Sequence, residues 1–263
     1  MRRVLSIFFL LFLSACTNDR DKAEEYFHDE EYEDALFHFQ KALKLDPSDW
    51  TLHYNIARSL EELGQYAEAI PCYRKSLELS LEDAQIYLGR GRCYMKSGDI
   101  ESAIMDFTNS VEANKSNFDA HYYRAQCYIK ELDYSKAFND INWCIKKRPK
   151  HLNSYYHRAI TQSQLGFNRQ ALQDLNHVIK RNKVFKEAYY NRAIIYQRLR
   201  EPHKAIADFN KAANLNYQTH DLYVRRGISY HDIGKVVEGC RDFRLLAKHD
   251  QQTSRALLAK YCD

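Results

Sequence analysis

Ala205-Ile206-Ala207-Asp208-Phe209-Asn210-Lys211-Ala212 is the stretch that decides the fold, because close copies of it recur along the chain at one fixed interval. The first residue of each copy lies 34 residues from the next, and the series runs Ala35, Ala69, Ala103, Ala137, Ala171, Ala205 and Gly239. Seven units therefore follow one another without an insertion or a deletion. A fixed period of this length is typical of stacked repeat architectures.

Three further sets of positions repeat with the same period. A small residue early in each unit is Ala23, Ala57, Gly91, Ala125, Ala159, Ala193 or Gly227, and the mostly large residue three positions later is Tyr26, Leu60, Tyr94, Tyr128, Gln162, Tyr196 or Tyr230. Four residues after the repeated alanine, the bulky site holds Phe39, Tyr73, Phe107, Ile141, Leu175, Phe209 or Phe243. The pattern resembles the tetratricopeptide repeat (TPR), whose unit is a pair of antiparallel helices, A and B.

The resemblance implies an all-α TPR solenoid, a right-handed superhelix of about seven helix-turn-helix repeats with a C-terminal capping helix. The expected units are 16–49, 50–83, 84–117, 118–151, 152–185, 186–219 and 220–253, and the cap is expected at 254–263. Packing considerations also favour paired helices, since small residues let two helices approach and large residues one turn away fill the gap between them. Glycines fall at the A–B turn of four units, at Gly64, Gly98, Gly166 and Gly234, where a left-handed backbone is predicted.

Five arginines of helix A recur in register with five aspartates of helix B. They are Arg90, Arg124, Arg158, Arg192 and Arg226, with Asp106, Asp140, Asp174, Asp208 and Asp242. Matching aspartates at a fixed offset favour structural ion pairs between neighbouring helices. A row of arginines that binds an anion is the alternative interpretation.

Residues 1–15 are expected to be a signal peptide rather than part of the fold. Arg2 and Arg3 precede an apolar run over residues 4–12, which is shorter than the roughly 20 residues that span a bilayer. Leu13-Ser14-Ala15-Cys16 resembles the lipobox of bacterial lipoproteins, which implies cleavage before Cys16 and its modification with lipid such as palmitate. Thr17 after the cysteine favours the outer membrane, facing the periplasm. An ordinary secretory signal is the alternative.

Charge is distributed unevenly along the chain. The first unit is acidic, which suits a solvated end cap or an acidic docking face. A later stretch is basic and should form one edge of the solenoid, through Lys146, Lys147, Arg148, Lys150, Lys180, Arg181, Lys183 and Lys186. Cations near helix C-termini are stabilised by the helix dipole, and binding of an anionic envelope polymer or lipid headgroups is the functional alternative. The net charge of only +4 argues against a nucleic-acid partner.

Helix A lines the concave groove in the TPR family, and its candidate residues here are largely tyrosines. The groove candidates are Tyr54, Arg58, Arg92, Tyr122, Gln126, Tyr156 and Tyr190. Tyrosine offers rigid contact area and a hydroxyl group, which suits the capture of a peptide or a helix. The alternative is that these tyrosines only pack between repeats.

Among the seven cysteines, Cys240 and Cys262 lie symmetrically about Gln251. In an antiparallel helix pair that symmetry brings them to one height, so a disulfide between them is feasible in an oxidising compartment. Cys72 and Cys93 are also symmetric about their turn but point less clearly toward each other. Cys127 and Cys144 are predicted to be buried thiols.

No phosphate-binding loop, metal-binding motif or nucleophile elbow occurs in the sequence, so we expect no catalytic residues, no metal site and no cofactor. The expected function is that of a lipid-anchored envelope scaffold or assembly adaptor that holds a protein partner in its groove. Direct binding of anionic polymer or lipid through the basic edge is one alternative. Self-association, with the acidic first unit of one chain meeting the basic edge of another, is a second.

Overall fold

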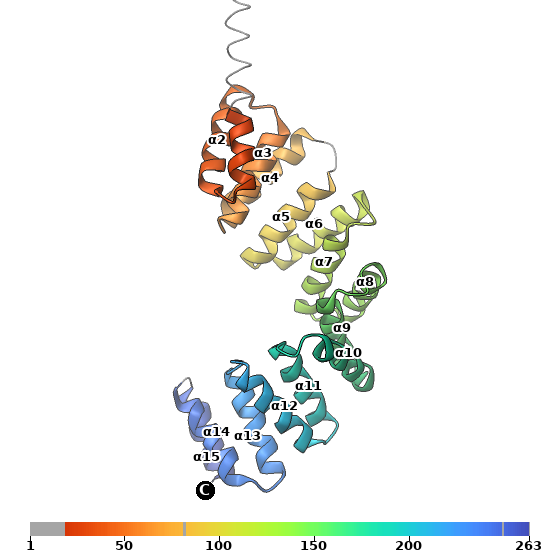
Figure 1. Ribbon diagram of the computed structural model, residues 1–263, viewed down its shortest axis with the longest axis vertical. Helices are drawn as coiled ribbons and strands as arrows, with labels where there is room; N and C mark the ends of the chain where they lie inside the picture. Colours follow the sequence, from red (N-terminus) through yellow and green to blue (C-terminus); the bar gives the residue numbers. More distant parts are fainter. Residues whose placement is uncertain (1–18, 81–82, 249, 263) are drawn as a thin grey trace, which may run out of the picture. The chain divides into compact units, whose positions relative to one another are not determined.

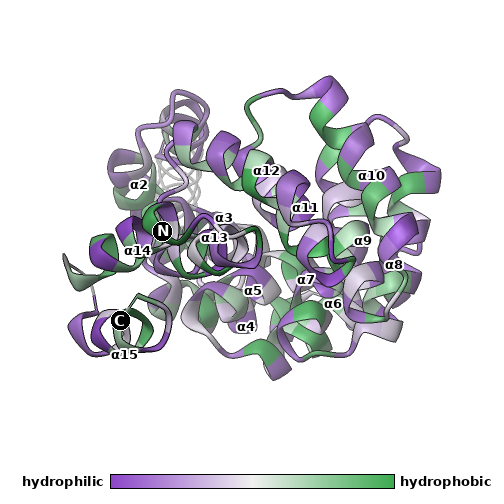
Figure 2. Ribbon diagram, turned by 90° about the horizontal axis from the view of Figure 1, so that it is seen from below, coloured by the Kyte–Doolittle hydropathy of each residue, from purple (hydrophilic) through white to green (hydrophobic). Residues whose placement is uncertain are grey.

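A computed structural model describes residues 19–80, 83–248 and 250–262, and the signal peptide and Cys16 lie outside these residues. Within them the chain is helical throughout and contains no strand (Figure 1). Hydrophobic and hydrophilic residues alternate around the helices, as Figure 2 shows for α10. None of the described helices has the length and apolar character needed to cross a membrane. The expected all-α class is therefore confirmed.

The chain divides into two compact units between Asp133 and Tyr134. Unit 1 contains a helix over residues 19–28 and then α2 (Tyr32–Leu45), α3 (Trp50–Glu62), α4 (Tyr66–Leu79), α5 (Ala84–Ser97), α6 (Ile100–Ala113) and α7 (Phe118–Lys130). Unit 2 contains α8 (Tyr134–Lys147), α9 (Leu152–Gln164), α10 (Asn168–Arg181), α11 (Lys186–Arg198), α12 (Pro202–Asn214), α13 (His220–Asp232), α14 (Val236–Leu245), the short η1 (Leu246–Lys248) and α15 (Gln251–Tyr261).

Helix A begins every 34 residues, at Trp50, Ala84, Phe118, Leu152, Lys186 and His220. The final helix differs from the expected bounds of 254–263, because α15 begins three residues earlier, at Gln251, and ends at Tyr261. The reason is a cap: the Asp250 carboxylate accepts a hydrogen bond of 2.9 Å from the backbone N–H of Thr253. Such a cap satisfies an N–H group that the first turn of a helix leaves without a partner.

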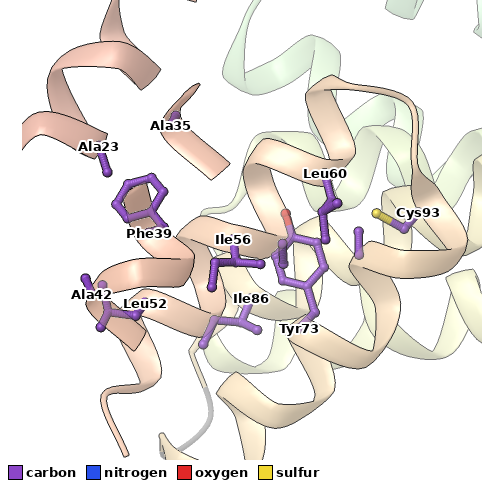
Figure 3. Close-up of a cluster of buried hydrophobic side chains, with 12 residues drawn as sticks. Ala23, Ala35, Phe39, Ala42, Leu52, Ile56, Leu60, Tyr73, Ile86 and Cys93 are labelled. Atoms are coloured by element: carbon purple, nitrogen blue, oxygen red, sulfur yellow. The ribbon is translucent and has the colours of Figure 1, made fainter. Parts of the chain in front are cut away.

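The repeated alanines form the contact between helices A and B. Ala35, Ala69, Ala103, Ala137, Ala171 and Ala205 are fully buried, and so is the bulky side chain four residues after each of them. Figure 3 shows this core in unit 1, where Phe39 lies beside Ala23. At Gly91 an added Cβ would lie only 2.8 Å from the ring of Phe107. Helix A therefore requires a small residue where the aromatic ring of helix B crosses it.

The A–B turn contains one residue with a left-handed backbone in every repeat. The four predicted glycines have positive φ angles of 74° to 89°, and the equivalent positions in the other repeats hold Glu30, Leu132 and Arg200, with φ angles of 60° to 64°. The glycine prediction is thus confirmed. The side chains at the other three positions adopt a backbone conformation that is costly for any residue with a Cβ atom.

Replacing Arg200 with glycine is therefore expected to raise the free energy of unfolding by about 0.5–1 kcal/mol. The side chain at this position is exposed, so little packing is lost. Replacing Gly166, which has the same backbone geometry, with alanine should lower the stability by about 1 kcal/mol. Urea unfolding followed by circular dichroism measures both changes, and equal signs for the two variants would contradict the argument.

The arginine–aspartate pairs are present in the structure and connect more than the two helices of one repeat. Arg192 donates from Nε and Nη2 to the Asp208 carboxylate at 2.6 and 2.7 Å, and from Nη1 to Asn176 at 2.6 Å. The aspartate lies 16 residues after the arginine, and the asparagine lies 16 residues before it, in the preceding repeat. Arg158 and Arg226 make the same three bonds, and Arg90 makes the bidentate pair with Asp106. These four pairs are structural, as predicted.

The helix over residues 19–28 is held by polar contacts that the sequence analysis did not foresee. Arg20 donates to the Asp49 carboxylate and to the Thr51 hydroxyl, both at 2.8 Å, and so connects this helix to the start of α3. Asp19 lies 2.8 Å from Nδ1 of His38 on α2. The helix over residues 19–28 is thus held to α2 and to the start of α3.

Candidate functional site

The groove candidates of unit 1 lie on the surface formed by helix A of successive repeats, here called the helix A face. Two equivalent arginines among them have different surroundings. Arg92 donates two hydrogen bonds to the Glu61 carboxylate, at 2.6 and 2.9 Å, and the hydroxyl of Tyr73 donates to the same carboxylate at 2.7 Å. Burial opposes the charge on Arg92, yet its bonds to Glu61 raise its pKa above the usual range. Arg92 is therefore part of the contact between repeats.

Arg58 lies one repeat earlier and is close to two aromatic rings. Its guanidinium carbon is 4.3 Å from the ring centroid of Phe27 and 5.6 Å from that of Tyr54. Tyr54 in turn packs on Tyr73, and burial raises its pKa. Cation–π contacts of this kind hold a guanidinium in place without using its N–H groups.

A hollow of about 570 Å³ opens beside Arg58 in unit 1. Its lining residues are Glu24, Phe27, His28, Glu30, Tyr32, Phe39, Asn55 and Arg58. They come from the first helix, from α2 and from α3, so the first two repeats together form the site. The hollow combines aromatic surface with one cationic group and two carboxylates, which is a composition suited to a peptide side chain.

The last two candidates of unit 1 lie on α7. The ring of Tyr122 stacks on that of Phe118, with centroids 6.1 Å apart and planes inclined by 15°. Gln126, one turn further along, is half-buried. The stacking favours a packing role for Tyr122, whereas nothing in the structure assigns a role to Gln126.

The candidate tyrosines of unit 2 make contacts between repeats. The amide of Asn191 donates to the Tyr156 hydroxyl at 3.0 Å, and the Tyr190 hydroxyl donates to the Asp221 carboxylate in the next repeat. Tyr190 is 8% exposed, and burial together with Asp221 raises its pKa. Removing these side chains would therefore change the packing as well as any binding surface.

Unit 2 has its own pocket on the helix A face, with a volume of about 110 Å³. Ile160 and Ile194 contribute apolar surface, and Gln164, Asn191 and Arg225 contribute polar groups. Arg198 also lines the pocket and is held by the backbone carbonyl and the hydroxyl of Ser163, at 2.8 and 2.7 Å. The pocket is smaller than the hollow of unit 1, and its cations are engaged: Arg225 donates to Asp221 at 2.6 Å.

The basic residues lie at the ends of α8 and α10 and in the loops that follow them. Lys146, Lys147, Arg148, Lys150, Lys180, Arg181 and Lys183 are exposed, and Lys186 is half-buried at the start of α11. Arg181 donates to Nδ1 of His177 at 2.9 Å, and the His177 ring stacks on Tyr155. Desolvation and the nearby Arg181 lower the pKa of His177, so the His177 ring adds little charge to this edge near neutral pH.

The structure joins Cys240 and Cys262 in a disulfide, with their Cα atoms 5.9 Å apart. Cys72 and Cys93 are not joined to each other, and Cys93 and Cys127 are buried thiols. Burial raises the pKa of Cys93 to about 12 and that of Cys127 to about 11. Cys144 is buried as well. Among the residues described, no cluster of histidine, cysteine and carboxylate groups could hold a metal ion.

Comparison with models of known protein families identifies the family to which the chain belongs. Residues 20–80, 54–109 and 88–141 match one family model for the tetratricopeptide repeat, and residues 186–218 match another. These matches together cover more than half of the sequence. The chain belongs to the tetratricopeptide repeat family.

Solved structures of low sequence identity share this fold. A TPR protein from Parabacteroides merdae is 20% identical with a TM-score of 0.70, and the match covers 95% of this chain and 100% of that one. PilF of Pseudomonas aeruginosa is 11% identical with a TM-score of 0.68, and the shares are 82% and 98%. YrrB, a TPR protein with an unusual peptide-binding site, is 22% identical with a TM-score of 0.61, and the shares are 70% and 94%. A search of curated proteins gives no match.

Arg58 could be identified as a groove residue from the sequence, whereas the hollow around it could not. Its other lining residues Glu24, Phe27, His28, Tyr32 and Asn55 were not considered as site residues. A signal was available, because Phe27 and Glu61 are 34 residues apart and therefore equivalent. The change from a carboxylate to an aromatic ring at this position distinguishes Arg58 from Arg92.

Proposed function

We propose that this TPR protein is a scaffold that holds a peptide or helix of a partner protein against its helix A face. The observation that supports this most directly is the open hollow of about 570 Å³ in unit 1, where the guanidinium of Arg58 lies over the ring of Phe27. Aromatic residues and arginine are the side chains that most often dominate protein recognition. The peptide-binding site named for YrrB occurs on the same fold. The proposal involves no catalytic step.

Photo-crosslinking tests the proposed function. A photoreactive amino acid is placed at His28 beside the hollow of unit 1, or at Gln164 beside the pocket of unit 2, in the full chain in cells. Met105 and Gln173, which are exposed on helix B, are the matched control positions. We expect one or more proteins to crosslink from the helix A positions and not from the controls. Equal crosslinking of the same proteins from all four positions would contradict a binding site on helix A.

We further propose that the protein is anchored by lipid on Cys16 at the outer membrane and faces the periplasm. The support comes from the sequence alone: Arg2 and Arg3, the apolar run over residues 4–12, and Leu13-Ser14-Ala15-Cys16. An anchored scaffold would confine its partner to the membrane surface.

Replacing Cys16 with serine is expected to abolish incorporation of labelled palmitate and to move the protein from the membrane fraction to the soluble fraction. The reason is that the lipid, rather than a membrane-spanning helix, supplies the anchor. Labelling with radioactive palmitate followed by fractionation measures both effects. Replacing Cys72, a half-exposed thiol of the folded part, is the control. Absence of palmitate from the unchanged protein would overturn the anchor.

The exposed cations at the ends of α8 and α10 favour a second candidate function, the binding of anionic envelope polymer or lipid headgroups. Surface charges interact less as salt increases, because the screening length falls to about 8 Å at physiological ionic strength. Binding to vesicles with anionic lipid should therefore weaken steeply with salt. Salt-independent binding would argue against this candidate.

A further inference from the structure

The two equivalent arginines of unit 1 differ in whether their N–H groups have an acceptor. Arg92 uses its guanidinium fork on Glu61 of the preceding repeat. Arg58 finds Phe27 at the equivalent position, and a ring cannot accept the five N–H groups in that way. Among the residues described in this structure, none accepts a hydrogen bond from the Arg58 side chain or forms an ion pair with it.

The position of Arg58 makes these N–H groups available to a ligand. The residue lines the hollow and is only partly buried, and its guanidinium carbon lies over the Phe27 ring, 4.3 Å from the centroid. A guanidinium held over a ring keeps its N–H groups for another acceptor, and a carboxylate matches their fork with two parallel hydrogen bonds. Phe27 and Tyr32, whose rings are 5.3 Å apart, offer apolar surface beside it.

The charged residues around the hollow indicate which kind of anion could bind to Arg58. Glu24 and Glu30 belong to its lining, and both are exposed, although Glu24 accepts a hydrogen bond of 3.3 Å from Nε of Arg20. Asp21, Glu25, Asp29 and Glu31 are exposed in the same repeat. A phosphate or another multiply charged anion would be repelled by these carboxylates. A single carboxylate with cationic neighbours suits both the arginine and its acidic surroundings.

We propose that Arg58 binds the side-chain carboxylate of an aspartate or glutamate in a basic segment of the partner protein. The carboxylate accepts two hydrogen bonds from the guanidinium, and an adjacent apolar side chain packs on Phe27 and Tyr32. Flanking lysine or arginine residues face Glu30 and the other exposed carboxylates of the first repeat. This inference rests on the proposed function, since it assigns the chemistry of the segment that the helix A face holds.

The repeat itself supplies the variant that tests the proposal. Replacing Phe27 with glutamate gives Arg58 the acceptor that Arg92 already has in Glu61. Replacing Phe27 with glutamine removes the same ring without supplying a charge, and is the matched control. Replacing Arg58 with glutamine removes the guanidinium and provides a second variant that does not depend on the new ion pair.

The experiment uses the full chain in cells with the photoreactive amino acid at His28, and a second series with it at Gln164. We expect Phe27→Glu to reduce crosslinking from His28 by roughly tenfold relative to Phe27→Gln, and Arg58→Gln to reduce it by roughly tenfold relative to the unchanged protein, as the loss of a charge-assisted hydrogen bond predicts. Crosslinking from Gln164 should keep the same partner in every variant. Mass spectrometry of the crosslinked partner should identify a basic segment that contains aspartate or glutamate.

Other outcomes separate this inference from the proposed function. If Phe27→Glu and Phe27→Gln crosslink equally from His28, or if the mapped segment contains no carboxylate, Arg58 does not bind one and the inference is overturned. Crosslinking from Gln164 without any from His28 also overturns the inference and leaves the proposed function intact. No crosslinking from either position would reject both.

Discussion

Replacing Asp106 with alanine is expected to lower the free energy of unfolding by about 3 kcal/mol. The Asp106 side chain is only 1% exposed and accepts two hydrogen bonds from Arg90, at 2.7 and 2.8 Å. The substitution leaves a largely buried guanidinium without its partner, and that uncompensated charge is more costly than the lost bonds alone. Chemical unfolding of the purified protein, followed by circular dichroism, measures the loss.

Two further variants distinguish the ion pair from a general effect of alanine in α6. Replacing Glu101, which is exposed on the same helix, with alanine should change the free energy of unfolding by less than about 0.5 kcal/mol. Replacing Arg90 with methionine together with Asp106 with leucine should recover much of the loss, because no buried charge remains. A double variant as unstable as Asp106→Ala would show that the cost comes from packing.

Removing the disulfide is the second large effect. Replacing Cys240 and Cys262 together with serine should destabilise the C-terminal helix pair by about 3 kcal/mol, since the bridge closes a loop across 22 residues of sequence. The remaining contacts of α15 are few: Ser254 donates to the carbonyl of Phe243 at 2.7 Å, and Tyr261 packs on Phe243 and His231. Only Ser254 of this helix is buried.

Hydrogen exchange measured by mass spectrometry gives a local test. We expect the amides of α15 to exchange faster in the double serine variant and in the reduced protein, while α10 and α11 keep their protection. Replacing Cys72 with serine is the control, because its thiol lies in unit 1 and is not joined to another cysteine. Unchanged exchange in α15 after reduction would show that packing alone holds the cap.

The fold could be predicted from the sequence because every repeat shows the same pattern of small and bulky residues, and each copy indicates the same helix pair. A small residue at Ala103 has a role only if a helix crosses there, and the bulky Phe107 one turn later fills the space beside the crossing. The turn glycines were equally informative, since Gly98 tolerates a positive φ angle that other residues avoid. Leu132 and Arg200 adopt that angle without any signal in their residue type.

The candidate site could be predicted only in part, because a position on a helix face does not determine which neighbour a side chain reaches. Tyr190 was correctly placed on helix A, but its hydroxyl extends to Asp221, 31 residues away. That reach depends on the crossing angle between repeats, which residue spacing does not specify. The hollow beside Arg58 likewise depends on how the first helix, α2 and α3 meet.

The hydrogen bonds of Arg192 also bear on how such a chain can change its length during evolution. Its two partners lie 16 residues before it and 16 residues after it, on the helices of two successive repeats. A deletion or insertion of a few residues between them would separate the arginine from one partner. Loss of 34 residues from Asn176 to Phe209 would instead join Asp174 and Leu175 to Asn210, and restore the same Asp-x-Asn order on one helix. Whole repeats are therefore the increments by which this protein can be shortened or extended while the arginines with two such partners keep both of them.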